Sequence, residues 1–238
     1  METRTALVTG ASRGIGAGIA RGLLSRGVQV AAGYRSGRAG VEALGAEFRG
    51  QVLPVRFDLA AESNPVAEVV DHWGRLDSLV LNAAVWNGGR LDTLDPAEWW
   101  RVVETNLKGM AAVTRAAIPA LVEGDRPSIV LVGSVVGIQG FAGDTAYGSV
   151  KAAMIGFARS LAKELARNDV RVNVLAPGFV ETDMTAEIPE RSRQRIASAT
   201  LLGRFGTVDE IAKAAVFLSE DATFCTGTVL TADGGWSL

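Results

Sequence analysis

The sequence has almost no cysteine or histidine. Cys225 and His72 are the only residues of these two types among 238. A single cysteine cannot form a disulfide bond within the chain. Metal sites built on sulfur and nitrogen ligands need several such residues together, so we expect no metal centre. The chemistry of the protein is therefore expected to depend on other side chains.

The sequence also lacks an excess of positive charge and any long apolar run. Its 24 Lys and Arg residues face 26 Asp and Glu residues, which gives a net charge of −2. Nucleic acids and anionic membranes attract proteins through a positive field, so neither is an expected partner. No apolar run approaches the ~20 residues that span a bilayer, and residues 5–9 resemble a strand rather than a signal peptide. The sequence predicts a cytoplasmic protein that acts on small molecules.

Glycine, in contrast, is abundant. It accounts for 28 of the 238 residues, well above the usual share of ~7%, which indicates many tight turns and close backbone approaches. Hydrophobic residues make up 48% of the chain and charged residues 21%, as is typical of folded globular proteins. We therefore expect a packed fold in which some glycine-rich turns have special roles.

Short apolar runs alternate with segments of helical periodicity. The expected strands cover residues 5–9, 28–33, 51–57, 78–81, 128–133, 170–176 and 228–231. The expected helices cover residues 15–24, 41–48, 65–73, 96–121, 147–166 and 208–218. Because runs such as SLVLN and SIVLVG are almost continuously apolar, helices should cover both faces of the sheet. The pattern predicts a doubly wound α/β fold with about seven mostly parallel strands.

No linker, repeat or low-complexity tract interrupts this alternation, so we expect residues 1–238 to form a single domain. The one sizeable irregular stretch covers residues 181–200. It follows the carboxyl end of an expected strand, where sheets of this type bind their ligands. We interpret it as a mobile substrate lid.

A glycine-rich turn joins the first expected strand to the first expected helix. It reads GASRGIG over residues 10–16, with the spacing GxxxGxG. Such glycines let the backbone approach the pyrophosphate of a dinucleotide, while the helix start offers N–H groups and a positive dipole end. The alternative is a tight turn without a ligand, but the position between strand and helix favours dinucleotide binding.

Tyr147 and Lys151 are four residues apart on an expected helix, so their side chains lie on one face. A phenol with an ordinary pKa of ~10 exchanges protons poorly at neutral pH, and a nearby ammonium group would lower that pKa. Ser134 ends an apolar strand, where its hydroxyl could bind a substrate carbonyl. Taken alone, the Tyr and Lys pair is more often structural, and Ser134 could be a turn residue.

The segment TGASRGIG at residues 9–16 resembles the cofactor loop of the short-chain dehydrogenase/reductase family. The resemblance continues over almost the full length of the chain. Asn-Ala-Ala at 82–84 is similar to that family's Asn-Ala-Gly, and Asn106 is similar to its helix asparagine. Ser134 resembles its catalytic serine, Tyr147 and Lys151 resemble its Tyr-x-x-x-Lys, and Pro177-Gly178 resembles its turn beside the nicotinamide. The stretches GSVVG, PGFVETDM and DGG look most like 3-oxoacyl-[acyl-carrier-protein] reductases and related polyketide ketoreductases.

This resemblance implies a Rossmann fold and a ketoreductase. Hydride would arrive from a nicotinamide while Tyr147 donates a proton to the developing alkoxide, and Asn106 would anchor a water or backbone link that supplies Lys151 with protons. Asn106 could instead be satisfied by local backbone. The expected catalytic residues are Asn106, Ser134, Tyr147 and Lys151. The expected cofactor-binding residues are Gly10, Ser12, Arg13, Gly14, Ile15, Gly16, Tyr34, Arg35, Ser36, Asp58, Leu59, Asn82, Ala83, Ala84, Tyr147, Lys151, Pro177, Gly178, Val180 and Thr182.

The end of the second expected strand carries no acidic residue. An NAD-specific site usually places Asp or Glu there to bind the adenosine ribose, but residues 33–36 read GYRS and no acid appears until Glu42. Arg35 and Arg13 could instead bind a 2′-phosphate through charge-assisted hydrogen bonds. The sequence favours NADP(H), with a solvated loop charge as the alternative interpretation of Arg35. By resemblance, Asp58 faces the adenine amino group.

Two residues depart from the family pattern. Ala84 adds a methyl group where relatives carry glycine, which we expect the adenosine side of the cleft to tolerate. Asp144 stands three residues before Tyr147, where fatty-acid reductases carry a neutral polar residue. A carboxylate there could raise the pKa of Tyr147, repel an anionic substrate or contact a hydroxylated one. The identity of the substrate is therefore left open.

Three functions follow as hypotheses. The leading one is NADPH-dependent reduction of a 3-ketoacyl thioester bound to acyl carrier protein, in fatty-acid or polyketide synthesis. Arg159, Lys163 and Arg167 form a partial basic stripe that could dock such an acidic carrier. The alternatives are NADP(H)-dependent oxidoreduction of a small ketone, sugar or alcohol, and a cofactor-sensing module without catalysis.

The two long expected helices, residues 96–121 and 147–166, carry more apolar residues than one sheet face needs. Exposed apolar helix faces commonly mark subunit contacts. The family resemblance implies a homotetramer with two-fold interfaces built from these helices and from residues 232–238. Met154 is expected to point outward into that interface.

Overall fold

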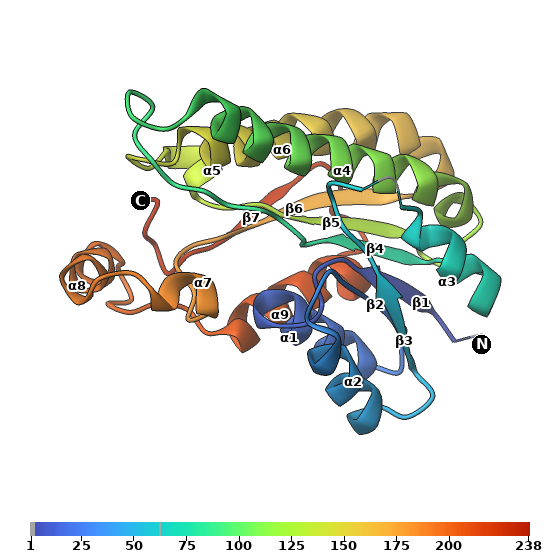
Figure 1. Cartoon of the computed structure of the whole chain (residues 1–238). Coiled ribbons are helices and arrows are strands. Elements are labelled where there is room, and N and C mark those ends of the chain that lie inside the picture. Colours follow the sequence, from blue (N-terminus) through green and yellow to red (C-terminus); the bar gives the residue numbers. More distant parts are fainter. Residues whose placement is uncertain (1–2, 62) are drawn as a thin grey trace.

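The computed structural model describes residues 3–61 and 63–238. Its centre is a seven-stranded sheet with the order β3-β2-β1-β4-β5-β6-β7, in which all neighbouring strands are parallel (Figure 1). The strands are β1 (Thr5–Val8), β2 (Gln29–Tyr34), β3 (Val52–Arg56), β4 (Ser78–Leu81), β5 (Ser128–Val132), β6 (Arg171–Pro177) and β7 (Val229–Ala232). The prediction of a doubly wound Rossmann fold is confirmed.

Helices cover both faces of this sheet (Figure 1). One face carries α1 (Gly14–Leu24), α2 (Arg38–Glu47) and α9 (Val208–Val216), and the other carries α3 (Pro65–Trp73), α4 (Pro96–Val122) and α6 (Thr145–Leu165). The shorter elements are α5 (Val136–Gln139), the 3-10 turn η1 (Ala166–Asn168), α7 (Asp183–Ala186), α8 (Glu190–Ala199) and the π-helical turn η2 (Phe217–Asp221). Each face of the sheet therefore has its own hydrophobic core.

β1 shows why the strands are continuously apolar. Leu7 packs into the core under α4 and α6, whereas Ala6 and Val8 pack into the core under α1 and α9. All three side chains are fully buried, because successive residues of a strand point to opposite faces. A polar residue on either face of this strand would lie in a core.

The strand order reverses beside β1, with β2 and β3 on one side of it and β4 on the other. In such sheets a crevice forms at this point, outside the carboxyl ends of the strands. The segments that follow β1, β2, β3, β4, β5 and β6 therefore meet at one edge of the sheet. The residues predicted to bind the cofactor and to react belong to these segments or to the helices beside them.

Residues 181–200 contain α7 and α8, so the expectation of an irregular stretch was wrong. α8 could not be predicted from the sequence, because Ile196 is its one buried residue and the helix therefore has no apolar stripe that a periodic pattern would indicate. Polar contacts hold it instead: Arg193 donates to the two carboxylate oxygens of Glu181 at 2.6 and 2.7 Å. α7 and α8 project from the carboxyl edge of the sheet (Figure 1), and their movement as a lid stays a prediction.

Met154 is buried, so the expectation that it points outward was wrong. Its side chain is 4% exposed and lies in the core under α4 and α6. Exposed positions near it on the same helix are Ala152, Ala153 and Gly156. A charge at Met154 would damage the core of the subunit itself, so it cannot test assembly. The homotetramer stays a prediction.

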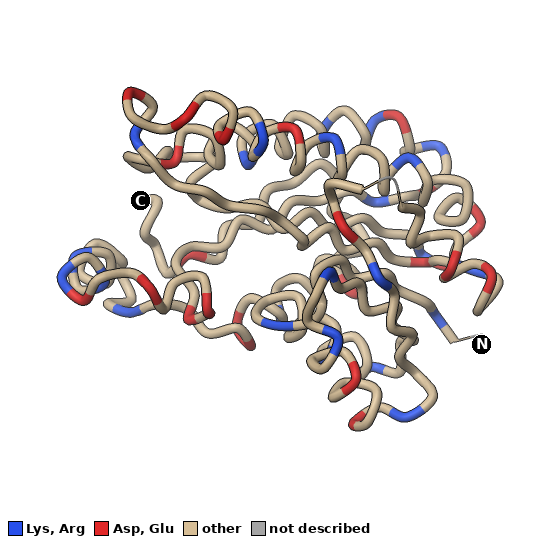
Figure 2. Tube along the Cα trace, in the orientation of Figure 1, with Lys and Arg blue, Asp and Glu red and all other residues tan. Residues whose placement is uncertain are grey.

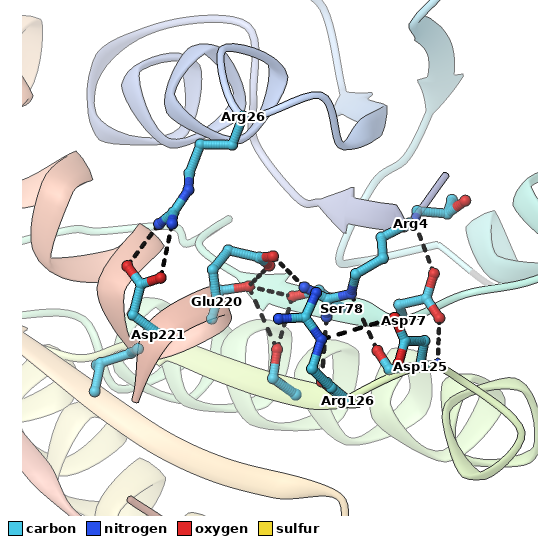
Figure 3. Close-up of polar contacts among 12 residues, drawn as sticks. Arg4, Arg26, Asp77, Ser78, Asp125, Arg126, Glu220 and Asp221 are labelled. Carbon is cyan, nitrogen blue, oxygen red and sulfur yellow. Dashed lines mark hydrogen bonds and ion pairs between the residues drawn. The ribbon is translucent and has the colours of Figure 1, made fainter. Parts of the chain in front are cut away.

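A buried polar network closes the amino edge of the sheet, opposite the predicted site (Figure 3). Arg4 forms an ion pair with Glu220 of η2, and both side chains are only 7% exposed. Arg4 also donates from Nη2 to the carbonyl oxygen of Arg126 at 3.1 Å. The Ser78 and Ser219 hydroxyls lie 2.7 Å apart. These contacts join η2 to the first residue of β4 and to Arg4, directly before β1, which in turn contacts the loop before β5.

Charged residues occur mostly on the helices and loops, and both signs are intermixed along the chain (Figure 2). Exposed pairs such as Arg21 with Glu47 and Arg26 with Asp221 join neighbouring elements. Within residues 3–61 and 63–238 there is no helix whose length and apolar character would let it cross a membrane.

Candidate active site

The glycine turn after β1 has a backbone conformation in which residues other than glycine would be strained. Gly10 and Gly14 have φ angles of 69° and 54°, in the left-handed region that favours glycine. A Cβ on Gly16 would overlap the carbonyl oxygen of Gly10. The turn is therefore packed too closely for side chains at these positions, and its path into α1 is fixed.

The amino terminus of α1 is open to an anion. Arg13 occupies the N-cap without a side-chain hydrogen bond to the helix, and the first turn holds no acidic residue. The free backbone N–H groups of the first turn of α1 and the positive end of the α1 dipole fit a pyrophosphate. The Arg13 guanidinium lies 3.4 Å from Asp183 of α7, and both side chains are exposed. The residues present therefore fit a dinucleotide.

Thr9 and Asn82 join the ends of β1 and β4. Asn82 Nδ2 donates to the carbonyl oxygens of Thr9 and Gly10 at 3.0 and 3.1 Å. The backbone N–H groups of Asn82 and Ala83 both donate to the Thr9 hydroxyl, at 2.9 and 3.0 Å. Half-buried Ala84 follows. Thr9 was not predicted from the sequence, although its place directly before Gly10 was a signal.

The turn after β2 packs against the glycine turn. Tyr34 ends β2 and is buried, whereas Arg35 and Ser36 are exposed. A Cβ on Gly40 would overlap the carbonyl oxygen of Ser12. This close contact brings the start of α2 beside the loop expected to hold the pyrophosphate.

A further positively charged side chain lies on the side of the site that is expected to hold the adenosine. Arg38 is the first residue of α2 and pairs with Glu42 at 2.8 Å. It was not predicted from the sequence, where only Arg13 and Arg35 were considered. Asp58 and Leu59 follow β3, and Leu59 packs on Gly109 of α4. The adenosine-side residues therefore lie along one edge of the sheet.

Tyr147 and Lys151 lie on one face of α6, as their spacing predicted. Lys151 Nζ is 5.2 Å from the centroid of the Tyr147 ring and donates to the carbonyl oxygen of Val132 at 2.7 Å. Val132 ends β5, two residues before Ser134. The Ser134 hydroxyl oxygen accepts from the N–H of Val136 at 3.1 Å. Ser134 and Lys151 are thus brought to the same strand end.

Burial governs the protonation of Tyr147 and Lys151. Lys151 is 3% exposed, and burial lowers its pKa to about 8. The pKa of Tyr147 is raised, first by burial and then by the charge of Asp144. The expected lowering of the Tyr147 pKa is therefore wrong in this structure, because burial and the charge of Asp144 outweigh the effect of Lys151, whereas the expectation that Asp144 could raise this pKa is confirmed. Tyr147 keeps its proton at neutral pH.

Asn106 anchors the loop that follows β4. Its side chain is 5% exposed, and its amide accepts from the Val85 N–H at 2.9 Å and donates to the Val85 carbonyl at 2.8 Å. It also donates to the carbonyl of Val102, one turn earlier on α4, at 2.7 Å. The contact with Val102 agrees with the interpretation that local backbone satisfies Asn106, whereas the contacts with Val85 were not predicted. A link from Asn106 to Lys151 stays a prediction.

The segment after β6 reaches both the Ser134 turn and the glycine turn. The Val135 N–H donates to the carbonyl of Pro177 at 3.0 Å, and the Gly178 N–H donates to the carbonyl of Ala232 at 3.1 Å. Val180 is buried. Thr182 starts α7, and a Cβ on Gly14 would contact its methyl group. The residues predicted to lie on the nicotinamide side therefore stand at the same edge of the sheet as the glycine turn and Ser134.

Trp86 and Asp144 form the rim of the site next to Tyr147. Trp86 is 48% exposed, and its indole N–H donates to Asp144 Oδ1 at 2.8 Å. The Gly89 N–H donates to the carbonyl of Gly143 at 2.7 Å, which holds the two loops together. Trp86 was not predicted from the sequence, because 58 residues separate it from Asp144.

Comparison with known proteins agrees with this geometry. Residues 10–237 match the family described as Enoyl-(Acyl carrier protein) reductase. The structure is similar to the crystal structure of a short-chain dehydrogenase/reductase, a glucose/ribitol dehydrogenase from Brucella melitensis, with a TM-score of 0.92 and 31% identity over 99% of this chain and 97% of the other. The chain belongs to the short-chain dehydrogenase/reductase family. It is an oxidoreductase with a nicotinamide-cofactor site.

Relatives with assigned activities cover the full chain. The chain is 39% identical to the 3-oxoacyl-[acyl-carrier-protein] reductase of Escherichia coli K12, over 98% of this chain and 97% of the relative. It is 38% identical to the enzyme of the same name from Thermotoga maritima, over 99% and 98%. The names of these relatives and of the Brucella protein all describe oxidoreductases, but they state different substrates.

Proposed function

We propose that the protein uses NADPH to reduce a 3-ketoacyl thioester, carried by acyl carrier protein, to the 3-hydroxyacyl product in fatty-acid or polyketide synthesis. One observation carries this proposal. Ser134, Tyr147 and Lys151 are all present, with Lys151 Nζ 5.2 Å from the centroid of the Tyr147 ring, in a chain that is 39% identical to a 3-oxoacyl-[acyl-carrier-protein] reductase over almost its full length.

Each residue of the site has a separate role in the proposed reaction. When bound, the cofactor supplies a hydride to the ketone carbon. The N–H groups at the start of α1 hold its pyrophosphate. The Ser134 hydroxyl binds the ketone oxygen, and Tyr147 donates its proton to that oxygen as negative charge develops. Lys151, which is protonated below its pKa of about 8, stabilises the phenolate that remains.

Arg35 supports the preference for NADPH. It is exposed directly after β2, in a position to bind a 2′-phosphate. Replacing Arg35 with Asp exchanges attraction for repulsion there. We expect the KM for NADPH to rise about 10- to 150-fold, which corresponds to the ~1.5 to 3 kcal/mol of a charged hydrogen bond. The KM for NADH should change little, and steady-state kinetics with both cofactors measures the two effects.

Arg49→Asp is the matched control, because it makes the same charge change at an exposed position just after α2. It should leave both Michaelis constants near their original values. If Arg35→Asp raises the KM for NADPH and NADH by the same factor, Arg35 does not contact the phosphate and the cofactor proposal loses its support.

The proposal extends to partners. Arg159, Lys163 and Arg167 are all exposed, on α6 and on η1 directly after it, and could dock an acidic carrier protein. Assembly into a homotetramer and a cytoplasmic location stay predictions. The name of the Brucella relative supports the alternative of a small sugar or alcohol substrate.

A comparison of substrates tests the proposed function. Purified protein is assayed with NADPH and either an acetoacetyl thioester or a panel of free ketones. The proposal predicts a clearly higher kcat/KM for the thioester. If thioesters are reduced no faster than simple ketones, the 3-ketoacyl assignment fails and the small-ketone alternative takes its place.

A further inference from the structure

Asp144 is a carboxylate without a cationic partner at the rim of the active site. No Lys or Arg of residues 3–61 and 63–238 forms an ion pair with it. On the loop that carries Trp86, Asp92 pairs with Arg90, and on α4 Glu98 pairs with Arg101. The charge of Asp144 is left without such compensation.

The negative charge of Asp144 acts on Tyr147, the proposed proton donor. Asp144 occupies the N-cap of α6, yet its side chain makes no capping hydrogen bond. After burial, its charge is the second cause of the raised pKa of Tyr147. A ketone that receives the Tyr147 proton must lie within hydrogen-bonding distance of that phenol. The substituents on its carbonyl carbon are therefore exposed to the same field.

Trp86 holds the carboxylate in place. Its indole N–H donates to Oδ1 of Asp144 at 2.8 Å, and the Gly89 N–H donates to the Gly143 carbonyl beside it. Burial raises the pKa of Asp144, while the hydrogen bond from Trp86 opposes that effect and favours the charged form. A half-buried, oriented charge acts more strongly than one on an open surface.

We propose that Asp144, oriented by Trp86, selects substrates by charge. Ketones with a neutral or cationic group near the carbonyl are accepted, and ketones with a carboxylate there are rejected. This inference deepens the proposed function and rests on it for the place of the substrate. It means that the site distinguishes the neutral thioester of a 3-ketoacid from the free 3-ketoacid.

Three probes of one acyl group test this selection. Acetoacetate is anionic, its ethyl ester is neutral and its choline ester is cationic. In the wild type we expect kcat/KM to increase from the anion through the neutral ester to the cation. Asp144→Asn keeps an acceptor for Trp86 but removes the charge. The ratio of the neutral to the anionic probe should fall about tenfold, as for two unit charges roughly 10 Å apart at an effective dielectric constant of about 20.

Two further variants separate charge from structure. Asp92→Asn removes a negative charge from the loop that carries Trp86 and should leave the ratio unchanged. Trp86→Phe keeps an aromatic ring but loses the N–H, so its ratio should lie between those of the wild type and Asp144→Asn. If Asp144→Asn changes all three probes by the same factor, or if the wild type shows no order by charge, the proposal is overturned.

The same assays distinguish this proposal from the proposed function. If thioesters prove no better than simple ketones while the order by charge holds and depends on Asp144, the 3-ketoacyl assignment fails and the selection by Asp144 stands. If thioesters are preferred but the ratio does not respond to Asp144→Asn, the assignment stands and the selection fails.

Discussion

Replacing Tyr147 with Phe is expected to lower kcat for ketone reduction by about 10²- to 10⁴-fold, the usual contribution of a positioned general acid. The structure gives the reason. Burial and the charge of Asp144 raise the pKa of Tyr147, so the phenol carries its proton at neutral pH and can donate it. Phe keeps the ring packed near Lys151 but offers no proton. The rate of NADPH oxidation with a ketone substrate measures the loss.

NADPH binding should survive this substitution, and a fluorescence titration should give a Kd within a few-fold of the wild-type value. Ser149→Ala is the control, since it removes an exposed hydroxyl from the same helix and should leave kcat unchanged. Full activity in Tyr147→Phe would assign the proton donor elsewhere. Absence of turnover in the wild type with every ketone tested would favour the cofactor-sensing alternative.

Replacing Arg4 with Met is expected to lower the free energy of unfolding by about 3 to 5 kcal/mol, because Glu220 would remain as a buried charge without its partner. For a chain of this length the melting temperature should fall by roughly 10 °C. Arg4 also donates to the carbonyl oxygens of Asp125 and Arg126 at 3.0 and 3.1 Å, so these groups lose a donor as well (Figure 3). Unfolding in urea, followed by circular dichroism, measures the change.

The exposed pair of Arg26 and Asp221 provides the control. Its side chains are 44% and 43% exposed, and exposed pairs contribute about 0 to 1 kcal/mol, so Arg26→Met should unfold close to the wild type. The double variant Arg4→Met with Glu220→Met removes both buried charges and should be more stable than Arg4→Met alone. Equal stability of Arg4→Met and the wild type would refute the importance of this buried pair.

Most of the fold could be predicted because its signals are local. Each strand is a short apolar run, and each major helix has an apolar stripe, so the alternation was visible along the chain. The missed helix α8 shows the limit. It buries Ile196 alone and is held by contacts such as that of Arg193 with Glu181, which no periodicity records. Met154 shows another limit, since apolar residues on α6 occupy both its buried and its exposed sides.

The candidate site was predicted where the chemistry follows from spacing. The GxxxGxG turn and the Tyr147 and Lys151 pair need only neighbouring residues. Trp86 and Arg38 were missed because their roles depend on partners or loops that are distant in sequence or outside any motif. The raised pKa of Tyr147 was expected from the charge of Asp144 alone, because its larger cause, burial, follows only from tertiary packing.

The sequence by itself determined the doubly wound fold, the dinucleotide turn and the identity of the groups available for proton transfer. These depend on residue type at short separations, where the geometry of strands and helices is nearly constant. The tertiary structure alone decided the electrostatic state of the site. It buried Lys151 and half-buried Tyr147, placed the carbonyl of Val132 against the ammonium group and brought the indole N–H of Trp86 to Asp144. Desolvation and the field of a charge depend on distance in space, and distance in space is fixed only when remote segments pack together.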